Sequence, residues 1–432
     1  LSLNSPFGMA RRKDYSPVPW QQYFEKYVDV ETDGGKFRVY LSPEPEHSHR
    51  PRLVTLHGGG YSGLSWALFA EEITNMIHCQ VISMDIRGHG ETQAVDPDDL
   101  SADTLVKDVE QVLYKLFGSE LPPLVLVGHS MGGAVAVRAA LQPALEPYVH
   151  GIAVIDVVEG TAMDALASMQ SFLRGRPTHF RSIEHAIEWC VRSGQVRNVD
   201  SAKVSMPSQI VNCETNQLAT NELDSHTAEE ASAPAPMLST VRSDSIAEEP
   251  EDGDVPELAE SPYVCSRYKW RIDLSKTERY WSGWFQGLSA RFLSVRAPRL
   301  LLLASIDGLD RELTVGQMQG KFQMQVLARC GHAVHEDTPG ELTLRIAMSL
   351  RMPIRGLPAP SRGLPSTPHR NHVVVLLTSF LLVSLFQPAG KPRPQKRVKF
   401  GILQKRKPLA PMWTRRVSQR CQESVRFFLE MK

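Results

Sequence analysis

The sequence predicts an α/β fold in which helices cover both faces of a mostly parallel, doubly wound sheet. Short apolar runs alternate with segments of helical periodicity, and the connections between them are short. One apolar run leads directly into a Gly-x-Ser-x-Gly turn, and an earlier run ends in a histidine followed by three glycines. The alternation predicts the sheet, and the two glycine-rich turns indicate where its chemistry lies.

The individual elements follow from these periodicities. A hairpin is expected over residues 29–40, turning at Gly34-Gly35, as an antiparallel entry to the sheet. Core strands are predicted at residues 52–56, 80–85, 124–127, 149–156, 299–304 and 322–327. Helices are predicted at residues 66–77, at 100–117 with Ser101 as N-cap, directly after the serine turn, at 163–173, at 183–193 and at 341–350.

The serine turn is the strongest chemical signal in the chain. Gly128 and Gly132 flank Ser130 at two residues on either side, after a buried strand and before an Ala/Val-rich helix. This is the pattern of a nucleophile elbow, in which the serine is strained and its neighbours must be nearly free of side chains. At a helix N-terminus, the Met131 N–H is expected to be one donor to an oxyanion.

The glycine run after His57 predicts the second donor. Glycine lets a backbone N–H approach a carbonyl oxygen closely, so we assign this donor to Gly59 or Gly60, with a plain tight turn as the alternative. Arg87 and His89 follow the next strand. We expect them to fix that turn structurally rather than to act in catalysis.

A serine nucleophile needs a base, and the base needs an orienting acid. His332 and His335 share the loop after the last strand, and His332 is favoured because it follows the strand more closely. For the acid, Asp156 ends one strand, whereas Asp307 and Asp310 follow the next. Spacing leaves this choice open.

Charge is distributed very unevenly, although Lys+Arg and Asp+Glu balance at 48 each. Residues 214–260 contain 13 acidic residues and one basic residue, whereas residues 340–432 contain 18 basic and three acidic residues. Charge therefore marks appendages of the fold. The six cysteines are dispersed, without C-x-x-C spacing or pairing with histidine, which argues against a disulfide framework and against a zinc site.

These patterns predict the following domain organisation. Residues 1–50 form an extension and the entry hairpin, 51–156 and 298–350 the core, and 157–297 a cap inserted after Asp156, with a disordered acidic insert at about 212–262. Residues 351–432 are predicted to be a disordered basic tail. Its apolar run, 373–386, is shorter than the roughly 20 residues that span a bilayer, so we do not expect membrane contact.

Several longer segments closely resemble the protein phosphatase methylesterases, members of the α/β-hydrolase superfamily. They are residues 15–20, 57–60, 128–133, 155–164 (IDVVEGTAMD), 276–281, 316–325 (GQMQGKFQMQ) and 331–337 (GHAVHED). The resemblance runs from about residue 11 to residue 339, apart from the acidic insert. It implies an α/β-hydrolase fold and a catalytic triad of Ser130, Asp156 and His332, with Asp307 as a structural residue.

The same resemblance implies a substrate. It is the methyl ester on the C-terminal leucine of the type-2A protein phosphatase catalytic subunit. The chemistry of the triad calls for no metal or organic cofactor, and no nucleic-acid partner is expected. The alternatives are a general carboxylesterase or lipase acting on small esters, and a non-catalytic phosphatase-binding regulator. After residue 339 the resemblance ends, which puts the closing helix in doubt.

The start of the chain bears on its location. It has no initial Met and no charged-then-apolar leader, so we expect an intracellular protein, truncated at its front. The cytoplasm is the expected compartment, with the nucleus as an alternative.

Overall fold

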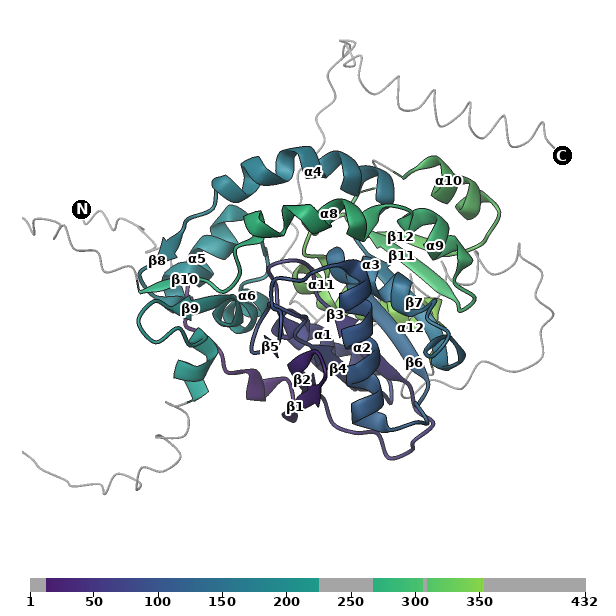
Figure 1. Ribbon diagram of the computed structural model, residues 1–432, viewed down its shortest axis with the longest axis horizontal. Helices are drawn as coiled ribbons and strands as arrows, with labels where there is room; N and C mark the ends of the chain where they lie inside the picture. Colours follow the sequence, from purple (N-terminus) through teal and green to yellow (C-terminus); the bar gives the residue numbers. More distant parts are fainter. Residues whose placement is uncertain (1–12, 225–266, 306–308, 351, 353–432) are drawn as a thin grey trace, which may run out of the picture. The chain divides into compact units, whose positions relative to one another are not determined.

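The computed structural model describes residues 13–224, 267–305, 309–350 and 352 of the chain. All of them belong to the first of two compact units, residues 1–360. Figure 1 shows a large twisted sheet between helices that lie on both of its faces. The predicted tail, apart from residue 352, lies outside the described residues, and so does its apolar run. Within the described ranges, no helix is long and apolar enough to cross a bilayer.

The main sheet has the strand order β1-β2-β4-β3-β6-β7-β11-β12, with β5 paired to β2. Neighbouring strands from β4 to β12 are parallel, whereas β1, β2 and β5 make the antiparallel pairs. The mostly parallel sheet predicted from the sequence is therefore confirmed. Its strands are β1 Lys26–Thr32, β2 Gly35–Leu41, β3 Arg52–Leu56, β4 Gln80–Met84, β5 Gln93–Ala94, β6 Leu124–His129, β7 Val149–Ile155, β11 Arg299–Leu303 and β12 Gln323–Val326.

Helices cover this sheet on both faces, because its central strands are apolar on both sides. One core packs α1, α11 and α12 against the sheet, and the other packs α2, α3, α9 and α10 against the opposite face. These helices are α1 Ala67–Met76, α2 Ala102–Phe117, α3 Met131–Ala139, α9 Leu288–Ser294, α10 Arg311–Met318, α11 Val334–Asp337 and α12 Pro339–Ser349. Short 3-10 turns span η1 Trp20–Gln22, η2 Gly63–Trp66 and η3 Glu146–Tyr148.

The segment between β7 and β11 forms a cap above the carboxyl ends of the parallel strands (Figure 1). Its helices are α4 Glu159–Arg174, α5 Ile183–Ser193, α6 Val199–Ser205 and α8 Glu278–Phe285, with 3-10 turns η4 Met206–Gln209 and η5 Leu274–Thr277. A small sheet, β8-β10-β9, joins β8 His179–Phe180, β9 Ile210–Asn212 and β10 Tyr268–Trp270. The cap has its own apolar core.

One predicted boundary in the cap changes. The acidic insert was expected from about residue 212, yet residues 212–224 are folded. Asn212 Nδ2 donates to Glu222 Oε1 at 2.7 Å, and an isolated bridge pairs Val211 with Leu218. The polar composition of this stretch hid these contacts, which depend on β9 and β10. The remainder of the predicted insert lies outside the described residues.

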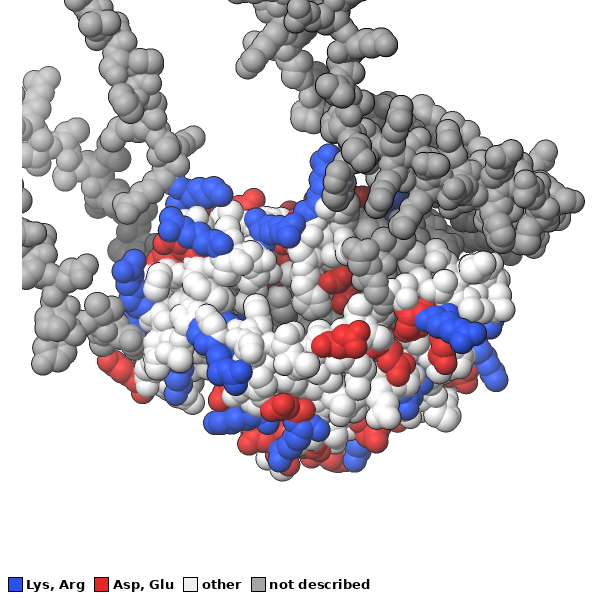
Figure 2. Space-filling model, turned by 90° about the horizontal axis from the view of Figure 1, so that it is seen from above, with Lys and Arg blue, Asp and Glu red and all other residues white. Residues whose placement is uncertain are grey.

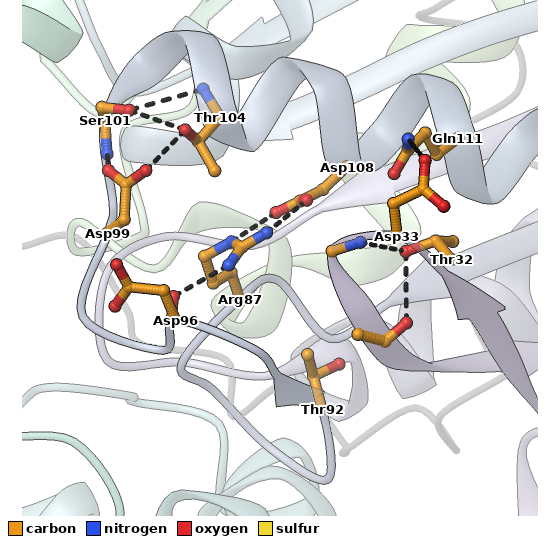
Figure 3. Close-up of polar contacts among 12 residues, drawn as sticks. Thr32, Asp33, Arg87, Thr92, Asp96, Asp99, Ser101, Thr104, Asp108 and Gln111 are labelled. Carbon is orange, nitrogen blue, oxygen red and sulfur yellow. Dashed lines mark hydrogen bonds and ion pairs between the residues drawn. The ribbon is translucent and has the colours of Figure 1, made fainter.

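Local signals fix the start of α2 and the turn before it. Ser101 caps α2 by accepting a hydrogen bond from the Thr104 N–H, as predicted. Figure 3 shows the Arg87 guanidinium in a two-pronged contact with Asp108 on α2, at 2.6 and 2.7 Å, and a third bond to the Asp96 carbonyl. Arg87 therefore fixes the turn after β4, as the sequence predicted.

Candidate active site

Ser130 stands on a sharp turn between β6 and α3. Its backbone has φ 52° and ψ −120°, in the left-handed region that costs a non-glycine residue energy. A side chain at Gly128 would overlap the Gly132 carbonyl, and one at Gly132 would overlap the Leu56 carbonyl on β3. Both glycines are therefore required by close packing, which holds the strained serine in place.

Asp156 lies directly after β7 and contacts the segment after β11 and the loop after β12. Its own φ is 51°, its Oδ1 accepts the Ala304 N–H after β11 at 2.8 Å, and its Oδ2 lies 2.8 Å from His332 Nδ1. A carboxylate only accepts hydrogen bonds, so Nδ1 carries the proton and donates it. This leaves His332 Nε2 with a free lone pair that can accept a proton.

The loop that carries His332 is tied down at two points. Asp337 accepts the Gly331 N–H at 2.6 Å and, with its other oxygen, the Arg197 N–H at 2.6 Å. The His332 carbonyl accepts from His129 Nε2 at 2.8 Å, so the loop is bonded to the residue that precedes the nucleophile turn. The ring of His332 remains about half exposed.

Ser130 and His332 line the same cavity, whose volume is about 290 Å³. Gly59 and Met131, from the two glycine-rich turns, also line it. Large apolar side chains of the cap form most of the remaining wall, among them Met169, Phe172, Leu173, Trp281 and Phe285. Aromatic side chains of α8 therefore contribute to the wall of this cavity.

The two candidate loop donors differ in their hydrogen bonds. The Gly60 N–H already donates to His89 Nε2 at 2.9 Å, and His89 Nδ1 in turn bonds to the Arg87 carbonyl. Burial lowers the pKa of His89 to about 4, so the ring is neutral near pH 7 and its Nε2 can accept. Among the described residues the Gly59 N–H has no acceptor, which makes Gly59 a better candidate for the donor than Gly60.

The other acid and base candidates lie elsewhere. His335 is fully buried, and neither of its ring nitrogens has a hydrogen-bond partner in the described part of the chain. Asp310 caps α10 by accepting the Leu313 N–H. Asp307 lies outside the described residues. Of the candidates that the structure describes, Asp156 and His332 are the pair in contact.

The chain was then compared with known proteins. The pattern of the alpha/beta hydrolase family matches residues 53–345. Protein phosphatase methylesterase 1 of Homo sapiens is 50% identical over 347 residues, which cover 79% of this chain and 86% of that protein. The Neurospora crassa protein of the same name is 36% identical and covers 79% of this chain and 76% of its own length.

The chain belongs to the protein phosphatase methylesterase family, within the alpha/beta hydrolases. Membership of this family assigns the chain to the carboxylic ester hydrolases.

Solved structures agree on the fold of this methylesterase family member. The crystal structure of E-2-(acetamidomethylene)succinate hydrolase has a TM-score of 0.52 at 16% identity and covers 75% of this chain and 99% of its own. An M. tuberculosis esterase has a TM-score of 0.50 at 16% identity, covering 75% and 91%. At such low identity the likeness extends to the fold alone.

Sequence reasoning missed two buried histidines whose hydrogen bonds connect the loops of this candidate site. His129 bonds the His332 loop, and burial keeps its pKa well below the ordinary value. His57 Nδ1 donates to the Gly58 carbonyl, and its Nε2 accepts the Ile86 N–H at 3.0 Å. His57 and His129 belong to the two glycine-rich turns, but these motifs do not show which distant residue each ring will contact through a hydrogen bond.

Proposed function

We propose that this chain is a serine carboxylesterase that hydrolyses the methyl ester on the C-terminal leucine of the type-2A protein phosphatase catalytic subunit and releases methanol. The relatives' shared name, protein phosphatase methylesterase 1, supports the reaction class and the kind of substrate. The observation that carries the proposal is the Asp156–His332 hydrogen bond beside the strained Ser130, with Ser130 and His332 on one cavity wall.

In this proposal Ser130 Oγ attacks the ester carbonyl, and His332 Nε2 takes the hydroxyl proton. Asp156 holds the ring through Nδ1 and stabilises the imidazolium that forms. The N–H groups of Met131 and Gly59 receive the oxyanion, each contributing about 3–4 kcal/mol if they resemble measured donors.

The second half of the reaction regenerates the serine. His332 returns the proton to the methoxide as the C–O bond breaks, so methanol leaves neutral. The same nitrogen then takes a proton from water, whose oxygen attacks the acyl-enzyme carbonyl. As the bond between the acyl carbon and Ser130 Oγ breaks, His332 returns this proton to Oγ, which restores Ser130 and releases the leucine carboxyl group as its carboxylate. The apolar cavity wall fits the leucine side chain by burying it away from water.

Two substrates separate this proposal from a general esterase. Turnover of the methylated phosphatase tail should exceed turnover of short p-nitrophenyl esters in kcat/KM. A strong preference for the p-nitrophenyl esters would instead indicate a general carboxylesterase.

Ser130→Ala should abolish turnover and retain phosphatase binding, measured by pull-down with the purified methylated phosphatase. Removing one hydroxyl deletes the nucleophile but leaves the apolar cavity wall in place. Ser168→Ala, at an exposed position on α4, is the matched control and should keep both properties. Loss of binding together with activity in Ser130→Ala would contradict the proposal, and full turnover by that variant would exclude Ser130 as nucleophile.

A further inference from the structure

A second hollow of about 330 Å³ adjoins the catalytic cavity, and Leu173, Arg176 and Leu274 line both. It lies where α4 ends and the small cap sheet begins, with Arg174 and Lys269 in its wall. Arg176 therefore borders both the catalytic cavity and this outer groove. We use the name outer groove for this second hollow.

Arg176 is held rigidly at the junction. Its guanidinium lies 3.6 Å from the centre of the Trp270 ring, and the indole N–H of Trp270 donates to the Pro177 carbonyl at 2.7 Å. Phe180 and Trp189 pack edge-on against the same indole. Stacking orients the guanidinium plane and leaves its edge donors available for a planar acceptor.

The guanidinium also lies close to the reacting centre. A side chain built on Gly60 would place its Cβ 3.9 Å from Arg176 Nη1, so the cation lies against the glycine loop that carries the Gly59 donor. Burial lowers the pKa of Arg176 to about 10, which still leaves it cationic at neutral pH.

The positive charge of the outer groove is not neutralised by the described residues. Arg174, Arg176 and Lys269 have no carboxylate within 4.0 Å in the described part of the chain. The one carboxylate in the groove wall, Asp273, accepts from Ser275 and lies 3.9 Å from Lys276. Figure 2, seen from above, shows several Lys and Arg side chains on the left, the side on which Figure 1 places β8 and β10, and others over the rest of this face.

We propose that Arg176, with Arg174 and Lys269, binds an acidic side chain of the substrate polypeptide a few residues before the esterified C-terminal residue. The inference rests on the proposed function. A methyl ester carries no charge, so an unpaired cation beside its cavity has no partner in the ester itself. A chain whose ester carbonyl lies at Ser130 must pass out of the cavity, and the wall that carries Arg176 leads into a positively charged groove.

The test uses the full chain and acetylated pentapeptides that end in leucine methyl ester. Each carries Asp or Asn at one of the three positions before the leucine, and methanol release gives kcat and KM. At the best position the wild type should prefer Asp over Asn by about tenfold in kcat/KM, as for a charge-assisted hydrogen bond. The difference should lie mainly in KM and should shrink as salt is added.

Variants assign this preference to Arg176. Arg176→Met should bring the Asp/Asn ratio close to one, and Arg176→Lys should keep part of it, because charge remains without the planar fork. Arg192→Met is the matched control. Arg192 is largely exposed, pairs with Glu188 and lines neither hollow, so the ratio should persist. Turnover of a short p-nitrophenyl ester shows whether each variant keeps an assembled Ser130 site.

The outcomes separate this inference from the proposed function. Hydrolysis of these peptides by the wild type without preference for Asp at any position would overturn the inference alone, even where a variant fails to fold. An Asp/Asn ratio unchanged in Arg176→Met, or an equal loss on both peptides, would also overturn it. Failure of the wild type to hydrolyse any methyl ester peptide would remove the proposed function and this inference together.

Discussion

At the scale of single residues, His335 shows how a buried titratable group ties this fold to pH. Its ring is fully buried between Trp66 and His129, at 4.3 and 4.4 Å between ring centres. Burial, and to a smaller extent repulsion by His332, lower its pKa from 6.5 to about 3. Below about pH 6.5, His335 therefore binds a proton in the unfolded chain but stays neutral in the folded chain.

The contribution of His335 to the free energy of unfolding is fully present above pH 6.5 and is lost as the pH falls toward 3. Between pH 8 and pH 5 the loss should be about 2 kcal/mol for a wholly buried group. His335→Leu should remove that part of the pH dependence, measured as the difference in the free energy of unfolding by urea at the two pH values. His47→Leu, at an exposed position, is the control. If the free energy of unfolding fell equally between pH 8 and pH 5 in the wild type and in His335→Leu, this ring would not titrate as described.

At the scale of elements, α12 closes the sheet face that supports the His332 loop. It packs against α1, and Leu342 and Ile346 are fully buried in the core beneath it. The segments that resemble the methylesterases end before this helix, and the alpha/beta hydrolase match ends within it, at residue 345. The apolar spacing of Leu342, Ile346 and Leu350 predicts the helix independently of both. Periodicity, rather than likeness, carries the prediction here.

Leu342→Ala should lower the free energy of unfolding by about 2–5 kcal/mol, because it removes a buried side chain and leaves a cavity. Glu341→Ala, one residue earlier and exposed on the same helix, should change stability by less than about 0.5 kcal/mol. Chemical denaturation of the two variants and the wild type measures both. A Leu342→Ala variant as stable as the wild type would mean that α12 does not pack as the structure shows.

Sequence patterns predict contacts between neighbouring residues better than contacts between distant segments. The strand, turn and helix around Ser130, and the Ser101 cap, depend on neighbours within a few residues, so their patterns are visible in the chain. The choice of Gly59 over Gly60 depends on His89, which arrives from another strand. The choice of Asp156 as the acid depends on which strand ends face the His332 loop, and spacing does not encode this.

At the scale of the whole molecule, the site is assembled where distant segments meet at one edge of the sheet. Ser130 follows β6, Asp156 follows β7 and His332 follows β12, and in a parallel sheet the carboxyl ends of these strands lie on the same side. The cap inserted after β7 then closes the cavity from above with apolar side chains. The candidate triad thus lies at the sheet edge, and the cap forms much of the cavity wall.

The most direct test of the central claim is covalent labelling by a serine-reactive fluorophosphonate, followed by mass spectrometry of the labelled peptide. We expect one adduct on Ser130 in the wild type. It should form far more slowly in His332→Ala and Asp156→Asn, because the serine loses its base or the base its correct tautomer. Absence of an adduct on Ser130, or equal labelling of the wild type and both variants, would contradict activation of this serine by the Asp156–His332 pair.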